Sequence, residues 1–420
     1  LKHSLNSGTK SVISALVGIA IHEGLIKSID DKVLGYFPDM KIANNDERKQ
    51  NLRIRDLLTM STGMNWEFTN NLSTNQMLQA QNWTKFVLDQ PMKEASGQNF
   101  NYCNGATQLL SAIIQKTSGK SAGEFAEEKL PLGIKDKYWS FSPEKVNSGY
   151  SGLYGLPTDM AKFGYLYLKK GRWNDRRLVP ETWIRESTKA QISANWTSIF
   201  PKYGYLWWMN RFGGYCALGY GGQYIFVIPE SELVVVFTGG LFTDTFFPGE
   251  VMEKYILPAI KAKDSLKPNP VGMASLHQAI NLVQNAPQPK PVPPLPKIAK
   301  SISGRTFVIE ESLNIRLTFD GSREAKFEEW PKYYSYRIGM DDVFRINDIG
   351  DAGALPDHNH GAYKGRWLDE STFQGIGRNL EEGFETIYTI HFDKDQVEMT
   401  MTSNVSSGET RLKGKLKQEP

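Results

Sequence analysis

The chain has 420 residues, 40% of them hydrophobic, which is enough length and apolar content for two domains with buried cores. It carries 49 basic and 46 acidic residues, a formal net charge of +3, so a nucleic-acid partner is not expected. Two cysteines, Cys103 and Cys216, can form at most one bridge, which excludes a disulfide framework and a cysteine-based zinc site.

The first part of the chain is predicted to be mainly helical. Apolar residues recur on one face of residues 11–23, and Gly24 is placed to end that helix. The apolar run within it, residues 12–21, is too short and too interrupted to cross a bilayer, so no transmembrane segment is expected. The same signals predict three more helices, at residues 53–58, 105–116 and 159–169.

Strands are predicted after these helices. Runs of β-favouring residues at 204–209, 224–228 and 233–238 predict an antiparallel meander, with a turn at 229–231 between the last two runs. The first domain is therefore expected to combine helices with a late antiparallel sheet.

A proline-rich segment over residues 285–297 has the composition of a stiff, extended spacer. Beyond it, short β-favouring runs predict an all-β module, either a barrel or a sandwich, with examples at 314–319, 333–338, 384–392 and 396–402. The expected organisation is a first domain over residues 1–265, a helix and proline-rich linker over 266–300, and an all-β accessory domain over 301–420.

The first chemical signal is a serine and a lysine three residues apart at a helix start, Ser7 and Lys10. That spacing puts the hydroxyl and the amine on one helix face, within hydrogen-bonding reach. A lysine can take a serine proton when burial lowers the pKa of the amine, and a helix N-terminus offers N–H groups to an oxyanion. Alone, the pattern more often describes a capping serine followed by a solvated lysine.

A second signal, Tyr102 and Asn104, stands directly before the helix predicted at 105–116. A tyrosine beside an ammonium group can ionise or relay a proton to a leaving group, and Asn104 could hold the Lys10 amine and a substrate carbonyl. Taken by itself, this pair also fits an ordinary core tyrosine and a turn asparagine.

The third signal is the glycine-bearing segment 219–223, which opens an apolar strand. Glycines there let a substrate backbone lie close to the sheet edge, where an exposed N–H group can complete an oxyanion hole. A glycine-rich hairpin loop would have the same composition.

Together and in this order, the S-x-x-K, Y-x-N and glycine-bearing segments resemble the serine β-lactamase and penicillin-binding-protein superfamily, in its class C-like branch. Further blocks look like that family, at residues 10–20, 30–38, 54–63 and 152–163, so the resemblance covers about residues 1–260. It implies an α/β (α+β) fold, in which an antiparallel sheet is flanked by helices and carries a helical subdomain. The C-terminal all-β barrel or sandwich is an addition to that fold.

Carried over to this chain, the resemblance implies acyl transfer to water through an acyl-enzyme on Ser7, with Lys10 as the base and Tyr102 as the proton relay. It also implies that Asn104 orients the substrate. The oxyanion hole would be made by the backbone N–H groups of Ser7 and Gln223.

Two departures from the family pattern bear on the substrate. Tyr220, Gly221 and Gly222 stand where β-lactamases and carboxypeptidases of this type usually have Lys-Thr-Gly, so the cation that would grip a substrate carboxylate is missing. This substrate-binding segment favours the family's esterases and short-amide hydrolases. The residue after the nucleophile is Gly8, where a larger residue is common.

Two other functions stay open: a β-lactamase or D-Ala-D-Ala carboxypeptidase, and a catalytically silent relative that binds a peptide or glycan. The intact Ser7, Lys10 and Tyr102 favour an enzyme acting on a small-molecule or short-peptide substrate. No metal and no organic cofactor are expected, and the histidines at 358 and 360 are interpreted as part of an exposed loop. The resemblance implies a periplasmic or extracellular location.

Three tryptophans are possible lining residues of a substrate cleft, Trp196, Trp207 and Trp208, although buried packing is the commoner environment of this residue type.

Overall fold

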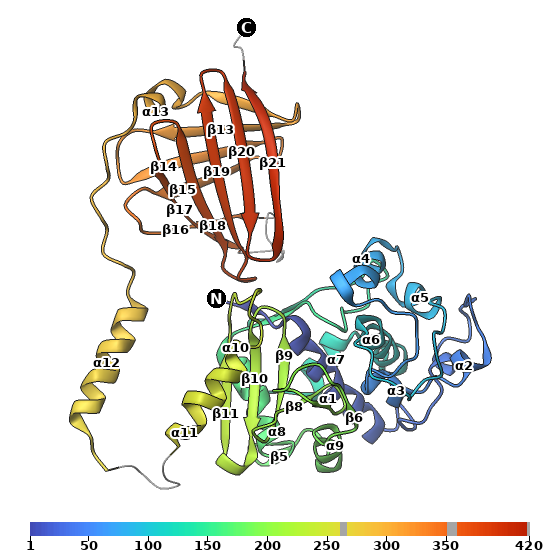
Figure 1. Cartoon of the computed structure of the whole chain (residues 1–420). Helices are drawn as coiled ribbons and strands as arrows, with labels where there is room; N and C mark the ends of the chain where they lie inside the picture. The colour runs from blue at the N-terminus through green and yellow to red at the C-terminus, as the bar shows by residue number, and fades with distance from the viewer. Residues whose placement is uncertain (261–266, 351–358, 418–420) are drawn as a thin grey trace. The chain divides into compact units, whose positions relative to one another are not determined.

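The computed structural model describes residues 1–260, 267–350 and 359–417, which form two compact units (Figure 1). Unit 1 comprises Leu1–Gly239 and Asp244–Lys261, and unit 2 comprises Gly240–Thr243 and Ala262–Pro420. Each unit has its own hydrophobic core. Among the described residues, no helix combines the length and the apolar character that a membrane crossing needs.

The centre of unit 1 is helix α1, Thr9–His22, whose residues from Thr9 to Ala20 are all buried. A short 3-10 turn, η1 (Asn6–Gly8), leads into it, and Gly24 follows its end with a φ of 74°. The other helices of this unit are α2 (Glu47–Gln50), α3 (Ile54–Leu58), α4 (Leu72–Gln79), α5 (Trp83–Leu88), α6 (Asn104–Ser118), α7 (Ala122–Lys129), α8 (Pro157–Leu168), α9 (Glu181–Ser187), α10 (Phe247–Val251) and α11 (Leu257–Ala259).

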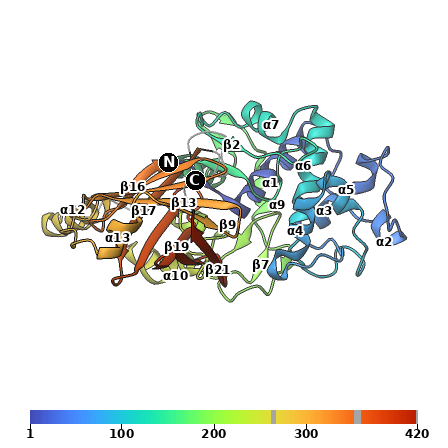
Figure 2. The same ribbon diagram turned by 90° about the horizontal axis from the view of Figure 1, so that it is seen from above.

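All four predicted helices are confirmed, as α1, α3, α6 and α8, with ends within two residues of the predicted bounds. Helices α2 to α6 gather on one side of unit 1 in both views and form the expected helical subdomain (Figures 1 and 2). Helix α8 packs on the sheet so closely that a Cβ atom on Gly164 would lie 2.6 Å from a Val234 methyl carbon.

The main sheet of unit 1 is antiparallel, with the strand order β11-β10-β9-β8-β7-β6. Its strands are β6 (Ile192–Ser193), β7 (Lys202–Tyr203), β8 (Trp208–Met209), β9 (Tyr215–Gly219), β10 (Gln223–Ile228) and β11 (Leu233–Phe237). Every residue of β10 is buried, because helices and neighbouring strands cover it on all sides. A small sheet with the order β1-β3-β2 lies apart, made of β1 (His3–Ser4), β2 (Tyr138–Trp139) and β3 (Leu153–Gly155), and β4 (Arg172–Trp173) pairs with β5 (Arg176–Arg177).

The predicted meander is present as β10 and β11, joined by a 3-10 turn at Pro229–Ser231. Of the strand predicted at 204–209, only Trp208 and Met209 form a strand, β8, and the prediction is wrong for residues 204–207. That stretch is the turn of a hairpin in which Tyr203 pairs with Trp208. Leu206 has a φ of 63°, and the Gly204 N–H group donates to the Trp207 carbonyl at 2.8 Å. The β-favouring residues of this segment, Tyr205, Leu206 and Trp207, are buried in the core, but their backbone forms a turn and not a strand.

Unit 2 contains α12 (Pro270–Gln284), α13 (Lys297–Ile302) and the barrel strands. In the described part of the chain, one sheet has the order β15-β14-β13-β12-β21-β20-β19-β18-β17-β16, and pairing of β15 with β17 closes nine of these strands into a barrel. The strands are β12 (Thr306–Ile309), β13 (Leu313–Phe319), β14 (Glu324–Trp330), β15 (Tyr334–Gly339), β16 (Arg345–Asp348), β17 (His360–Trp367), β18 (Thr372–Asn379), β19 (Glu385–Asp393), β20 (Gln396–Ser403) and β21 (Ser406–Leu416). The all-β module is therefore a barrel, and not a sandwich.

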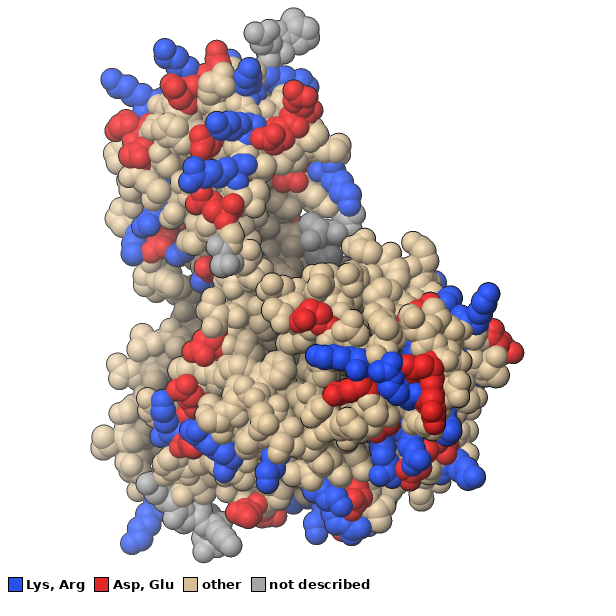
Figure 3. Space-filling model, turned by 45° about the vertical axis from the view of Figure 1, so that its right-hand side comes forward, with Lys and Arg blue, Asp and Glu red and all other residues tan. Residues whose placement is uncertain are grey.

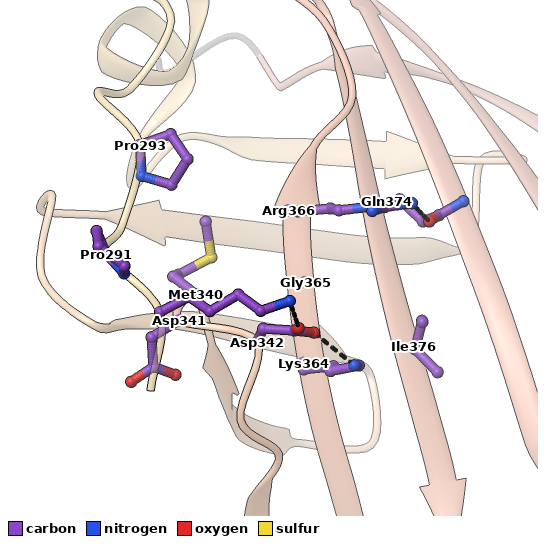
Figure 4. A pocket seen from close by; sticks show the side chains of 11 residues that line it. Pro291, Pro293, Met340, Asp341, Asp342, Lys364, Gly365, Arg366, Gln374 and Ile376 are labelled. Atoms are coloured by element: carbon purple, nitrogen blue, oxygen red, sulfur yellow. Dashed lines mark hydrogen bonds and ion pairs between the residues drawn. The ribbon is translucent and has the colours of Figure 1, made fainter. Parts of the chain in front are cut away.

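The proline-rich segment belongs to unit 2, and part of it is packed. Residues 286–296 form no helix or strand, yet Val292 and Leu295 lie against the barrel core. The Lys290 N–H group donates to the Asp341 carbonyl at 2.9 Å. Asp342 accepts from both Lys290 and Lys364 at 2.6 Å, at a pocket beside β17 and β18 (Figure 4). The second half of the predicted spacer is thus attached to the barrel.

Candidate active site

The turn that carries Ser7 is fixed from two sides. The Leu5 N–H group donates to the Leu153 carbonyl of β3 at 2.8 Å. Asn6 has a left-handed φ of 46°, and its side-chain amide donates to the Tyr220 carbonyl at 2.8 Å. Asparagine adopts this backbone region more readily than most residues. Ser7 is therefore held between β3 and the end of β9.

Gly219, the last residue of β9, lets the strand come up against this turn. A Cβ atom at that position would lie 2.1 Å from the Leu5 carbonyl oxygen and 3.1 Å from the Asn6 Cβ atom. Any side chain larger than hydrogen would have to displace the nucleophile turn. The predicted glycine-bearing segment is therefore next to the predicted nucleophile.

Lys10 lies in the first turn of α1, and its side chain is only 1% exposed. Its Nζ atom is 2.8 Å from Ser7 Oγ and donates to the Tyr150 carbonyl at 2.9 Å. Within the described part of the chain, no carboxylate bonds or ion-pairs with this amine. Burial lowers the pKa of Lys10 well below its usual value, and only a small opposing effect comes from Cys103. A neutral amine can accept the Ser7 proton.

Tyr102 lies just before α6 and is 6% exposed. The Lys10 amine is 4.8 Å from the centroid of its ring. Burial raises the pKa of the Tyr102 phenol, while a side-chain hydrogen bond with Ser7 acts in the opposite direction. The phenol consequently keeps its proton at neutral pH and can give that proton away.

Asn104 is the first residue of α6 and is buried. Its Nδ2 atom donates to Thr74 Oγ1 of α4 at 3.0 Å. Its Oδ1 atom is buried without a hydrogen-bond partner among the described residues. The recorded partners of the Lys10 amine are Ser7 and Tyr150, so Asn104 is anchored to α4 and does not hold the lysine.

The segment between β9 and β10 forms a tight turn in which Gly221 and Gly222 have φ values of 80° and 87°. Tyr220 at its tip is 47% exposed. Gln223 opposes Gly219 in the strand pair, and its side-chain amide donates to the Gly239 carbonyl at 2.6 Å. The backbone of Gln223 is thereby fixed close to the nucleophile turn, since η1 packs on both β9 and β10.

The predicted residues Ser7, Lys10, Tyr102, Gly219 and Gln223 are thus brought together. Tyr150 was missed by sequence reasoning, because the group that holds Lys10 is a backbone carbonyl, which every residue type has. Asn6 could have been found from one signal, an asparagine directly before the nucleophile, where a left-handed turn is needed.

The tryptophans divide between the site and the core. The rings of Trp196 and Trp208 lie 5.4 and 5.9 Å from the Tyr102 ring. Trp207 is fully buried and packs 4.4 Å from the Tyr167 ring. Two of the three candidates therefore adjoin the site.

Other reactive groups lie outside this arrangement. Cys103 and Cys216 are both free and buried, and burial raises the pKa of the Cys103 thiol to about 12. His358 lies outside the described residues. The exposed loop predicted for His360 is wrong, because this half-buried residue begins strand β17, and its Nδ1 atom is 2.7 Å from Glu381 Oε1. The described residues contain no cluster of three or more histidine, cysteine or acidic side chains that could hold a metal ion. Basic and acidic side chains are intermixed over the visible surface (Figure 3).

Comparisons with known proteins agree with this geometry. Residues 2–249 match the sequence profile of the Beta-lactamase family. An uncharacterized protein of Alkalihalophilus pseudofirmus is 25% identical over 250 residues, which is 54% of this chain and 70% of that protein.

Solved structures give the same fold. A Bacillus anthracis protein named as a 6-aminohexanoate-dimer hydrolase superposes with a TM-score of 0.53 at 20% identity, over 61% of this chain and 73% of that one. A penicillin-binding-protein homologue from Pyrococcus abyssi, described as octameric, has a TM-score of 0.46 at 17% identity, over 98% of this chain and 88% of its own.

The profile covers more than half of the chain and includes Ser7, Lys10 and Tyr102, which confirms the resemblance predicted from the motifs. The chain therefore belongs to the Beta-lactamase family, and it shares its fold with the Bacillus anthracis protein.

Proposed function

We propose that this chain is a serine hydrolase that cleaves an ester or a short amide through an acyl-enzyme on Ser7. The observation that supports this most is the Lys10 amine, 2.8 Å from the Ser7 hydroxyl, buried, and without a carboxylate partner among the described residues. A solvated lysine beside a capping serine would be exposed and charged. The buried amine instead has the properties of a general base.

In the acylation step, Ser7 Oγ attacks the substrate carbonyl carbon while Lys10 takes the hydroxyl proton. The electron pair of the carbonyl bond moves to its oxygen, and the backbone N–H groups of Ser7 and Gln223 donate to that oxyanion. Tyr102 gives its proton to the leaving oxygen or nitrogen as the bond to carbon breaks. Lys10 then returns the serine proton to Tyr102, so both groups regain their starting states.

In the deacylation step, a water molecule takes the place of the leaving group. Lys10 accepts one of its protons while the oxygen attacks the acyl carbon, and Ser7 Oγ leaves with that proton. The products are a carboxylic acid and an alcohol or amine. No metal ion and no organic cofactor takes part in the proposed reaction.

The turn after β9 supports a substrate without a carboxylate at this position. Tyr220 is exposed at the place where carboxylate-gripping relatives would have lysine. A phenol cannot supply the charge-assisted hydrogen bond that an ammonium group gives to a carboxylate. This is the reason to prefer esters and short amides over β-lactams and D-Ala-D-Ala peptides.

The decisive experiment is covalent labelling with a fluorophosphonate, followed by mass spectrometry of the intact protein and of its peptides. We expect one adduct, on Ser7, and none in Ser7→Ala. Ser231→Ala is the matched control, because Ser231 is an exposed serine of the same unit. An adduct elsewhere, or unchanged ester hydrolysis by Ser7→Ala, would contradict the assignment, and a folded protein without any adduct would favour a silent binding protein.

A further inference from the structure

Tyr102 is surrounded by an aromatic cluster, defined here as Phe68, Phe100, Trp196 and Trp208. Their ring centroids lie 5.1, 6.4, 5.4 and 5.9 Å from that of Tyr102. The members come from distant segments: the loop before α4, the stretch before α6, the β6–β7 connection and β8. The fold therefore gathers these rings at one place, around the group that we propose as proton donor.

The cluster has a buried part and an accessible part. Tyr102 and Trp208 are buried, whereas Phe68, Phe100 and Trp196 are half-buried. Phe68 and Trp196 also pack against each other, with centroids 5.2 Å apart and ring planes inclined by 63°. Rings in such edge-to-face arrangements leave aromatic surface to which another ring can add.

The cluster is also uncharged. Among the described residues, the only cation recorded over any of its rings is Lys10, at Tyr102. The five side chains themselves, Tyr102 with its raised phenol pKa included, carry no charge at neutral pH. An uncharged ring can therefore pack on this cluster without needing an ionic partner, whereas a carboxylate placed there would lose hydration without gaining one.

The proposed mechanism fixes which part of the substrate lies here. Tyr102 donates its proton to the leaving oxygen or nitrogen, so the leaving group starts at the Tyr102 hydroxyl, and the half-buried rings of Phe68 and Trp196 are accessible neighbours of that residue. We infer that the leaving group carries an uncharged aromatic ring, which packs against Phe68 and Trp196. This inference rests on the proposed function and adds the substrate class to it.

The test compares acetate esters that differ only in the alcohol: benzyl acetate, propyl acetate and acetylcholine. For the wild-type protein we expect kcat/KM for benzyl acetate to exceed that for propyl acetate on the order of tenfold. Acetylcholine tests the rival occupant, a cation held against the ring faces, and should be a poorer substrate than benzyl acetate. Equal values for the benzyl and propyl esters, or a preference for acetylcholine, would overturn the inference.

Substitutions assign the effect to the cluster. Trp196→Ala should bring the benzyl-to-propyl ratio close to one, and Trp196→Phe should restore most of it. Trp173→Ala is the matched control, because Trp173 is a half-buried tryptophan of unit 1 that packs on Tyr165 at 6.1 Å. An unchanged ratio in Trp196→Ala would place the leaving group elsewhere.

Binding to Ser7→Ala separates this inference from the proposed function. Quenching of tryptophan fluorescence in that variant should show tighter binding of benzyl acetate than of propyl acetate, and Trp196→Ala in the same background should remove the difference. Failure of fluorophosphonate labelling would refute the nucleophile alone. Equal binding of the two esters would refute the aromatic site even in a protein that is labelled on Ser7.

Discussion

The Lys10 amine and the Tyr102 ring lie 4.8 Å apart, and burial changes their proton affinities in opposite directions. It lowers the pKa of Lys10, whose charged form is the protonated one, and raises the pKa of Tyr102, whose charged form is the deprotonated one. One dry environment therefore favours the uncharged form of both groups. A neutral amine and a neutral phenol beside Ser7 have the chemistry that the proposed base and acid need.

The pH dependence of kcat/KM should reflect this arrangement. The rate should rise as Lys10 loses its proton, and it should reach its plateau at pH values at which an ordinary lysine is still protonated. It should fall again only at strongly alkaline pH, as Tyr102 ionises, and Tyr102→Phe should remove that fall while lowering the rate. A rate that still climbs through the ordinary lysine pKa would exclude Lys10 as the base.

Lys10→Met should lower kcat/KM by about a hundredfold or more. The same substitution should stabilise the fold. The depressed pKa means that the unfolded chain holds a proton that the folded chain lacks, between the folded pKa of Lys10 and the ordinary lysine value. In this window the free energy of unfolding of the wild type rises with pH. Methionine has no group that takes up this proton on unfolding. The free energy of unfolding of Lys10→Met should therefore exceed that of the wild type, on the order of 1 kcal/mol, and the difference should be larger at lower pH.

Calorimetric melting of the wild type and Lys10→Met at several pH values measures this difference. Lys27→Met is the control, because Lys27 is exposed. If Lys10→Met is instead less stable than the wild type by the same amount at every pH, Lys10 stabilises the fold, and burial of its amine does not cost stability.

The helices of unit 1 and the contact between Ser7 and Lys10 could be predicted because their signals are local. Helix α6 begins and ends where the periodicity and Gly119 place it, and Gly119 has a φ of 70°. Ser7 and Lys10 are neighbours on one helix turn, so their contact follows from spacing alone.

The hairpin at 204–207 and the aromatic cluster could not be predicted, because both depend on contacts between distant segments. Leu206 takes a left-handed backbone conformation while its N–H group donates to the Leu58 carbonyl at 3.0 Å. Phe68 and Trp196 meet at Tyr102 only after three segments have folded together. Residue type and periodicity are local signals, and they do not indicate which distant segments come into contact.

Gly219→Ala should displace the turn that carries Ser7, although Gly219 itself takes no part in the proposed reaction. The new methyl carbon would lie 2.1 Å from the Leu5 carbonyl oxygen, so the turn carrying Ser7 must shift or the strand must move away. We expect at least a tenfold loss of kcat/KM and a destabilisation of about 1–3 kcal/mol. Gly35→Ala is the matched control, since a Cβ atom there meets nothing within 4 Å. Wild-type rates of fluorophosphonate labelling in Gly219→Ala would contradict this account of the turn.

Replacing Tyr220 should alter substrate preference. The wild-type protein should cleave p-nitrophenyl acetate much faster than nitrocefin, which carries a carboxylate. Tyr220→Lys should raise the nitrocefin rate relative to the ester by about tenfold, because the ammonium group can then pair with that carboxylate. Tyr255→Lys, which adds the same charge at another exposed tyrosine of unit 1, should not do so. Efficient nitrocefin turnover by the wild type would favour a true β-lactamase.

The last prediction concerns the barrel of unit 2. Every residue assigned here to the chemistry lies in unit 1, and the two units have separate hydrophobic cores. A domain with its own core can in principle fold alone. A chain ending at Gln284 should therefore still be labelled on Ser7 by a fluorophosphonate, at a rate similar to that of the full chain.

The same truncation of Ser7→Ala serves as the control for non-specific labelling, and circular dichroism reports whether the shortened chain is folded. A folded, truncated protein that is no longer labelled would show that the barrel supplies part of the substrate site. In that case part of the substrate site would lie beyond residue 303, in a region that contains none of the family's motifs. Labelling at the rate of the full chain would instead show that the barrel does not contact the reacting atoms, because its removal does not slow acylation. The barrel would then have a role other than acyl transfer.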